Sequence, residues 1–286
     1  MLKIHQLSKC YPGGIQALQK VSLTCHEGVY GLLGQNGAGK STLMRTLATL
    51  QNADSGEATL DDIDLLRSHH LARQHIGYLP QDMGVYPRMT ALETLQYFAG
   101  LKGLSRSSEL LSKLEQVNLA NEANQRLDTF SGGMKRRFGI AVAFLGNPRL
   151  VIVDEPTAGL DPFERRRFQY ILAEAAQNCI LILSSHIVED IADLADRMAI
   201  IHHGQVVAED SPASLIREMN NKVWTKEIPF EEFKTFQEHY QLLSWRPGRT
   251  THRVRVYSNN HPGNGFTRCE AVLEDFYAYR VSPNSK

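Results

Sequence analysis

The sequence predicts an α/β protein with a mostly parallel central sheet. Two unbroken apolar runs of strand length, Leu150–Val153 and Ile180–Leu183, indicate strands that are buried on both faces, as in a parallel sheet. Segments with apolar residues at helical spacing alternate with such runs. Because ligands bind beyond the carboxyl ends of the strands in open α/β sheets, we expect a binding site at that edge.

A phosphate-binding loop lies between a strand-like run, Val29–Leu33, and a helix-like segment. Gly34–Ser41 fits the pattern G-x-x-x-x-G-K-[ST]. Glycines let backbone N–H groups curl around a phosphate, Lys40 reaches the β- and γ-phosphates, and Ser41 ligates Mg²⁺. The helix presents its positive end to the anion. Its apolar residues recur at helical spacing: Leu43, Met44, Leu47 and Leu50. The loop predicts binding of ATP or GTP.

Polar residues follow the two buried strands. Asp154 and Glu155 come directly after Leu150–Val153, and His186 follows the end of Ile180–Leu183. We expect Asp154 to hold Mg²⁺, directly or through water, and Glu155 to act on the water that attacks the phosphate. Considered alone, an acidic pair at a strand end is equally well explained as a capped turn. The phosphate-binding loop favours the catalytic interpretation.

A five-residue segment between these motifs narrows the class of phosphate-loop protein. Phe130–Met134 reads F-S-G-G-M, which resembles the L-S-G-G-Q signature of the ATP-binding cassette (ABC) ATPase family, with Met134 in place of Gln. The resemblance covers about residues 2 to 215. Further family marks stand in the expected order: Tyr11 as the adenine-stacking aromatic, Gln81 as the Q-loop, Ala158–Asp161 as the D-loop and His186 as the switch histidine.

The resemblance implies an α/β P-loop NTPase fold of ABC type, with an N-terminal antiparallel β region and a helical subdomain at about residues 82–148. It implies Mg²⁺-dependent hydrolysis of ATP. The expected catalytic residues are Glu155, His186, Lys40 and Gln81, and the expected metal ligands are Ser41, Gln81 and Asp154. The residues expected to contact ATP are Tyr11, Gly34, Asn36, Gly37, Ala38, Gly39, Lys40, Ser41, Thr42, Ser131, Gly132, Gly133 and Asp161.

The signature segment predicts a helix with a basic start. Ser131 is a good N-cap, and three cations crowd the first turn: Lys135, Arg136 and Arg137. Positive charge there opposes the helix dipole at a cost of up to about 1 kcal/mol, which an approaching anion relieves. We expect no partner for this charge in the same chain. In the family the anion is the γ-phosphate held by a second subunit, which implies a head-to-tail homodimer or heterodimer. A solvated basic face is the alternative for a residue such as Arg137.

Composition argues against nucleic acid as a partner. The 286 residues contain 31 Lys and Arg and 31 Asp and Glu, so the formal net charge is zero. The four cysteines form no C-x-x-C pair and are expected to be reduced thiols in a cytosol. The histidine pairs His69-His70 and His202-His203 are expected at the solvated surface rather than on a metal. No apolar run approaches the ~20 residues of a membrane helix, and the start has no signal peptide.

The organisation predicts an ATPase domain at residues 1–218 and an accessory α+β segment at 219–286. A short helix, Ala213–Met219, leads into this tail. The remaining expected elements are a strand at Lys222–Ile228, a helix at Phe230–Leu243, a strand pair reaching Val256 and a final helix at Ala271–Tyr279. Leu273-Glu274-Asp275-Phe276 resembles the closing motif of ATPase subunits from exporters of drug, sodium and polysaccharide type.

Two function classes remain: the energy-coupling ATPase of a transporter, and a soluble ABC ATPase acting on DNA or ribosomes. The chain has one copy of each motif and no sustained heptad between Ser41 and Ser131, which favours the transporter. Tyr86-Pro87 and Met89-Thr90 look exporter-like. We expect a location on the cytoplasmic face of the cell membrane, against a transmembrane permease subunit. The expected docking segment is Gln81–Thr90, with an apolar patch of Met83, Val85, Tyr86 and Met89; the alternative is that these side chains pack inside the helical lobe.

Overall fold

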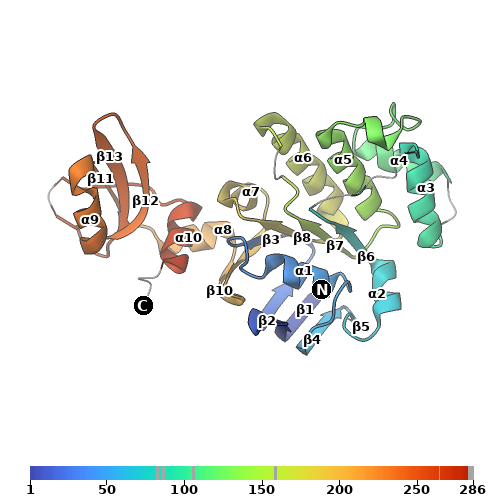
Figure 1. Cartoon of the computed structure of the whole chain (residues 1–286), viewed down its shortest axis with the longest axis horizontal. Helices are drawn as coiled ribbons and strands as arrows, with labels where there is room; N and C mark the ends of the chain where they lie inside the picture. Colours follow the sequence, from blue (N-terminus) through green and yellow to red (C-terminus); the bar gives the residue numbers. More distant parts are fainter. Residues whose placement is uncertain (82–83, 85–87, 105–106, 158–159, 264, 283–286) are drawn as a thin grey trace. The chain divides into compact units, whose positions relative to one another are not determined.

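The chain folds into two compact units, Met1–Val206 and Val207–Lys286 (Figure 1). The structure is a computed structural model that describes residues 1–81, 84, 88–104, 107–157, 160–263 and 265–282. The domain boundary expected after residue 218 stays a prediction. Among the described residues, no helix combines the length and the apolar character needed to cross a bilayer.

A mostly parallel six-stranded sheet forms the centre of the fold, in the order β10-β9-β3-β8-β7-β6. Strand β3 pairs in parallel with β8 and β9, and β7 pairs in parallel with β6 and β8. The strands are β3 (Gly28–Leu33), β6 (Ile76–Leu79), β7 (Leu150–Asp154), β8 (Ile180–Ser185), β9 (Arg197–His202) and β10 (Gln205–Asp210). All residues of β7 and β8 are buried, which confirms the strands predicted from unbroken apolar runs.

A second sheet near the N-terminus is antiparallel, in the order β2-β1-β4-β5. Its strands are β1 (Leu2–Tyr11), β2 (Ile15–Cys25), β4 (Ser55–Leu60) and β5 (Ile63–Asp64). Helix α1 (Lys40–Leu47) shares one apolar core with both sheets. Members of this core from each layer include Leu2, Leu23, Leu32, Met44 and Ile182. Burial of these side chains fixes the phosphate-binding loop between two rigid layers.

The remaining helices of the first unit fall into two groups. Those outside the stretch expected to be helical are α2 (His69–His75), α6 (Pro162–Ala175), the 3-10 turn η2 (Ala176–Asn178) and α7 (Val188–Ala192). The stretch expected to be helical contains α3 (Ala91–Leu101), α4 (Ser107–Gln116), η1 (Leu127–Thr129) and α5 (Gly132–Ala143). Thr90 starts α3 with a reciprocal cap: its hydroxyl accepts the N–H of Glu93, whose carboxylate accepts the N–H of Thr90.

The C-terminal unit is an α+β fold around a sheet of order β12-β13-β11-β14. Its elements are α8 (Pro212–Glu218), β11 (Val223–Pro229), η3 (Phe230–Glu232), α9 (Phe233–His239), β12 (Gln241–Pro247), β13 (Thr251–Tyr257), β14 (Thr267–Arg268) and α10 (Leu273–Val281). The buried Phe236 of α9 packs in one apolar cluster with side chains of three strands or their flanks, among them Trp224, Val254 and Phe266.

The sequence L-E-D-F near the C-terminus closes this unit. Leu273, Asp275 and Phe276 are buried. The Asp275 carboxylate accepts the Val272 N–H at 2.9 Å and two hydrogen bonds from Arg255 in β13, at 2.9 and 2.5 Å. The hydrogen bond from Arg255 to Asp275 raises the pKa of Arg255. The tetrapeptide therefore has a structural role within the unit.

One predicted helix end is wrong, and α1 is shorter than the helical spacing of its apolar residues up to Leu50 indicated. Helix α1 stops at Leu47 because Thr49 adopts a left-handed φ of 59°, and Leu50 is 58% exposed. Helix α9 stops at His239 rather than Leu243, because Gln241 and Leu242 pair with Tyr257 and Val256 of β13. Strand β14 was not predicted. In each case a tertiary contact or a single backbone angle overrides the local apolar pattern.

Gly77 provides a test of the packing of β6 on α5. A Cβ at Gly77 would lie 1.9 Å from the carbonyl oxygen of Ala143. Gly77→Ala is therefore expected to lower the free energy of unfolding by about 3 kcal/mol, the upper range for overpacking. Gly100→Ala in α3 is the control, since apart from its chain neighbours and its own helix backbone no described atom lies within 4 Å of a Cβ there. Urea denaturation measures both variants, and equal midpoints would contradict the packing argument.

Candidate active site

The loop Gly34–Ser41 joins β3 to α1, as predicted. Two positions of the loop require glycine because a backbone carbonyl oxygen from another segment lies close to each of them. A Cβ on Gly34 would lie 2.4 Å from the Ile201 carbonyl oxygen, and a Cβ on Gly39 would lie 2.4 Å from that of Ala17. Gly39 also has a φ of 111°, which L side chains rarely adopt. The loop is thus held in one shape by its neighbours.

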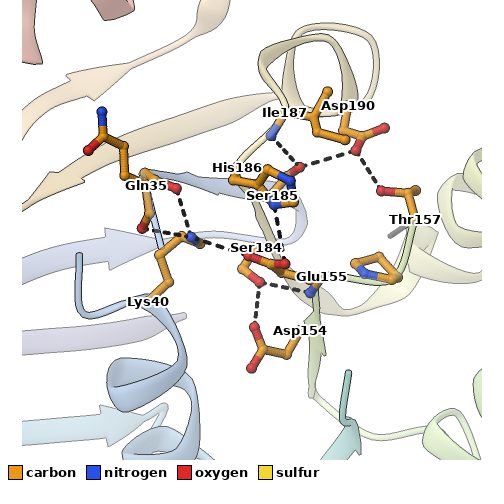
Figure 2. A network of polar contacts seen from close by, with 12 residues as sticks. Gln35, Lys40, Asp154, Glu155, Thr157, Ser184, Ser185, His186, Ile187 and Asp190 are labelled. Atoms are coloured by element: carbon orange, nitrogen blue, oxygen red, sulfur yellow. Dashed lines mark hydrogen bonds and ion pairs between the residues drawn. The ribbon is translucent and has the colours of Figure 1, made fainter. Parts of the chain in front are cut away.

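Lys40 is buried at the base of this loop, with 4% of its surface exposed. Its Nζ donates to the carbonyl oxygens of Gly34 at 2.7 Å and Gln35 at 3.2 Å. The same nitrogen lies 3.3 Å from Glu155 Oε1 (Figure 2). A buried ammonium is costly unless acceptors surround it, and three oxygens from two strand ends fulfil that need.

The acidic pair at the end of β7, Asp154 and Glu155, is held by a serine of β8. Ser184 Oγ donates to Asp154 Oδ1 at 2.6 Å and accepts the Glu155 N–H at 2.9 Å (Figure 2). Glu155 has a left-handed φ of 45°, a strained conformation for a non-glycine residue. Asp154 is buried, and burial together with the charge of Asp154 raises the pKa of the neighbouring Tyr78. Both acids are therefore fixed in place.

The Glu155 carboxylate bridges two other predicted site residues. One oxygen faces Lys40, and the other lies 3.2 Å from His186 Nδ1. The His186 side chain is 41% exposed, so it is open to a ligand from outside. The structure thus brings Lys40, Glu155 and His186 together from three separate segments of the chain.

An open cleft of about 430 Å³ adjoins these residues. It is lined by Tyr11, Ile15, Gln16, Ala17, Gln35, Asn36, Gly37, Gly39, Lys40, Ser41, Thr42, Gln81 and Glu155. Most of the residues expected to contact ATP therefore share one cleft with the expected base and the Q-loop glutamine. Gln81 itself is exposed, two residues after the end of β6.

Tyr11 is positioned at the cleft by its hydroxyl group. The hydroxyl donates to Gln51 Oε1 at 2.9 Å and lies 3.4 Å from Thr42 Oγ1. Gln51 Nε2 in turn donates to the Thr42 carbonyl oxygen at 2.9 Å. The ring is thereby held as part of the cleft lining, the location that adenine stacking requires.

The signature helix has partners in its own chain, and the predicted lack of partners is wrong. Arg136 Nη1 donates to the Pro156 carbonyl oxygen at 2.6 Å. Arg137 is buried and lies 3.4 Å from the Glu164 carboxylate, so it does not belong to a solvated face. The cap is confirmed, because Ser131 Oγ accepts the Met134 N–H at 3.2 Å. The basic start of α5 is thus joined to the segment that follows Glu155.

Among the described residues, those of the signature and the D-loop that are expected to contact ATP do not line the cleft of their own chain. This applies to Ser131, Gly132, Gly133 and Asp161. Asp161 instead caps α6 by accepting the N–H groups of Phe163 and Glu164, each at 2.9 Å. The D-loop residues Ala158 and Gly159 lie outside the described residues, as do Met83, Val85 and Tyr86 of the expected docking patch.

Two polar residues of this site were missed by sequence reasoning. Ser184 carried a usable signal, because it is the first hydroxyl after the apolar run of a strand adjacent to β7. Gln51 carried none: it follows α1 in an irregular segment, and only the fold brings it to Tyr11.

Comparison with known proteins decides the family. Residues 18–158 match the family model described as "ABC transporter". NatA of Bacillus subtilis, an ABC transporter ATP-binding protein, is 36% identical over 208 residues, which cover 70% of this chain and 84% of NatA. The chain belongs to the ABC transporter family.

A second bacterial relative and a longer eukaryotic one extend the comparison. The linearmycin resistance ATP-binding protein LnrL of Bacillus subtilis is 35% identical, over 73% of this ABC chain and 68% of LnrL. ABC transporter A family member 8 of Dictyostelium discoideum is 38% identical over 70% of this chain, but the chain spans only 24% of that protein.

Solved ABC cassettes share the fold. An ATP-binding subunit of an ABC transporter superposes with a TM-score of 0.69 and 29% identity, over 76% of this chain and 92% of the other. A dimeric post-hydrolysis cassette bound to ADP and Pi has a TM-score of 0.67 and 25% identity, over 74% of this chain and 98% of the other. The predicted α/β fold of ABC type is therefore confirmed.

Proposed function

We propose that this ABC chain is the ATP-hydrolysing subunit of a membrane transporter and energises export through a separate transmembrane permease. The observation that carries the proposal is that Lys40 and His186 both contact Glu155, which lines the phosphate-loop cleft together with Lys40. The names of NatA and LnrL support the transport role and, for LnrL, a role in resistance.

The geometry of Lys40 indicates how ATP is held. In the structure its ammonium group is satisfied by two carbonyl oxygens of the loop and by Glu155. A bound γ-phosphate offers stronger, doubly charged acceptors in the same cleft, so Lys40 moves its contact from Glu155 to the phosphate. Glu155 is then released to accept a proton from the attacking water, while His186 orients the Glu155 carboxylate.

The donor set near the cleft fits a magnesium ion. Ser41 and Gln81 line the cleft, and the buried Asp154 is the last residue of β7. Hard oxygen donors with one carboxylate, completed by phosphate and water, are the ligands that Mg²⁺ prefers. When bound, the ion neutralises charge that develops on the transferred phosphoryl group.

The separation of the signature from the cleft supports a two-chain site. Ser131 and Gly132 are exposed at the N-terminus of α5, where backbone N–H groups attract an anion. Arg136 and Arg137 already have partners, so we expect the backbone N–H groups, the Ser131 hydroxyl and Lys135 to receive the γ-phosphate. The solved relative that is dimeric and bound to ADP and Pi supports a pairing of two chains. The proposed pair is head to tail, with ATP at the interface.

The permease is proposed to dock at Gln81–Thr90 on the cytoplasmic face of the membrane. Gln81 lines the nucleotide cleft and lies in the same short stretch as the docking residues, so a shift at the γ-phosphate reaches the partner directly. Within this stretch Arg88 is exposed, whereas Met89 is half-buried and its carbonyl oxygen accepts the Leu127 N–H. Met89 therefore contributes less apolar surface than expected.

Catalysis is tested with two variants of the cleft. Glu155→Gln is expected to lower turnover by roughly 10²- to 10⁴-fold and to retain ATP, because the amide cannot take the proton from water but keeps an acceptor oxygen for Lys40. Lys40→Ala is expected to weaken ATP binding itself. Retention of radiolabelled ATP and phosphate release are the measurements. Glu189→Gln, an exposed acid on α7, is the control and should match the wild type. Wild-type turnover in Glu155→Gln removes Glu155 from the mechanism.

Assembly is tested by light scattering of Glu155→Gln with and without Mg-ATP. We expect a dimer only with nucleotide, because hydrolysis is blocked and the γ-phosphate remains to bridge two chains. The double variant Glu155→Gln/Lys40→Ala should stay monomeric under the same conditions. A monomer at every nucleotide and protein concentration would contradict the homodimer and leave a heterodimer as the pairing.

The membrane partner is tested by photocrosslinking in native membranes, followed by mass spectrometry. A crosslinker placed at Arg88 is expected to capture a transmembrane protein, whereas the same group at Lys3, exposed on β1, is the control. Capture of ribosomal proteins or DNA from Arg88, without a membrane protein, would favour the alternative soluble ABC ATPase.

A further inference from the structure

Asp190 of α7 is a buried acid to which the sequence assigned no role. Its side chain is 1% exposed. Oδ2 accepts hydrogen bonds from Thr157 Oγ1 at 2.6 Å and Ser185 Oγ at 3.1 Å, as Figure 2 shows. Oδ1 accepts from Gln169 Nε2 at 3.0 Å and from Arg165 Nε. Four side chains thus converge on one carboxylate.

The donors on Oδ2 come from the two segments that carry the reacting groups. Thr157 is two residues after Glu155, and Ser185 directly precedes His186. Ser185 Oγ also accepts the Ile187 N–H at 2.9 Å, so it fixes the turn on which His186 stands. The donors on Oδ1 both come from α6, which anchors the carboxylate from the opposite side.

The side chains of Glu155 and His186 need such support. The His186 side chain is 41% exposed, and its Nδ1 lies 3.2 Å from the Glu155 carboxylate. Both residues follow strand ends, where the backbone is no longer held by the sheet ladder. A buried carboxylate adds little net stability, since desolvation offsets its interactions, but four bonds in a dry site define one geometry.

We propose that Asp190 is a positioning residue for ATP hydrolysis: through Thr157 and Ser185 it sets the distance between Glu155 and His186. It touches neither ATP nor the attacking water. The inference rests on the proposed function, because it assigns Asp190 a part in the same reaction. Loss of a positioning residue lowers the rate of the chemical step. Loss of a purely structural residue would lower ATP binding or the stability of the fold.

The test compares two variants that each remove one bond to the same carboxylate. Thr157→Val deletes the hydroxyl on the Oδ2 side, and Gln169→Met deletes the amide on the Oδ1 side, where Arg165 still holds the carboxylate. We expect kcat of Thr157→Val to fall roughly tenfold, the order of a lost hydrogen bond to a charged group, with KM for ATP within about twofold. Thr157→Ser should restore kcat, and Gln169→Met should keep it within about twofold.

Steady-state ATP hydrolysis and thermal melting of the full chain provide these values. The inference is overturned if Thr157→Val has the same kcat as the wild type. It is also overturned if Gln169→Met loses as much kcat as Thr157→Val does, or if a lower melting temperature of Thr157→Val accounts for its loss of kcat. Absence of turnover in the wild type, assayed with its membrane partner, overturns the proposed function and the inference with it. Wild-type turnover with an unaffected Thr157→Val overturns the inference alone.

Discussion

The burial of one ammonium group determines how the cleft is built. Lys40 lies inside the protein, where an unpaired positive charge is not tolerated, so the structure must surround Nζ with acceptors. The loop provides two of them by turning the Gly34 and Gln35 carbonyl oxygens inward, and Glu155 provides the third. The curled backbone of the loop and the left-handed backbone at Glu155 accompany the placement of these three oxygens around the Lys40 ammonium group. In the sheet, β8 lies between β3 and β7. This order sets the distance between the ends of β3 and β7, which lead into the phosphate-binding loop and Glu155.

The parts of the fold predicted from sequence are those encoded over a few adjacent residues. Unbroken apolar runs identified β7 and β8, and the glycine pattern identified the phosphate-binding loop, because both signals are local. The cap of α5 at Ser131 was found for the same reason. The end of α9 was not, since Leu242 and Leu243 suit a helix face as well as a strand, and pairing with β13 decides between them. Sequence spacing carries no record of that pairing.

The polar partners within the site were harder to predict than the site residues themselves. Ser184 is 30 residues from Asp154 in the chain, and Arg136 is 20 residues from Pro156, so no motif joins them. We expected the basic start of α5 to have no partner, and this was wrong. The helix-dipole argument describes an isolated helix, whereas Arg137 is buried against α6. Partner identity depends on which segments the sheet brings side by side, and that is a property of the whole fold.

The role of L-E-D-F has a consequence for tracing this tail through evolution. Asp275 caps its helix and binds Arg255 with both carboxylate oxygens, while Leu273 and Phe276 fill the interior. The L-E-D-F sequence therefore reflects the packing of the C-terminal unit and not the substrate of a transporter. Homologous tails that lose the acid are expected to lose the arginine as well, so covariation of these two positions is a better marker of common descent than the tetrapeptide alone.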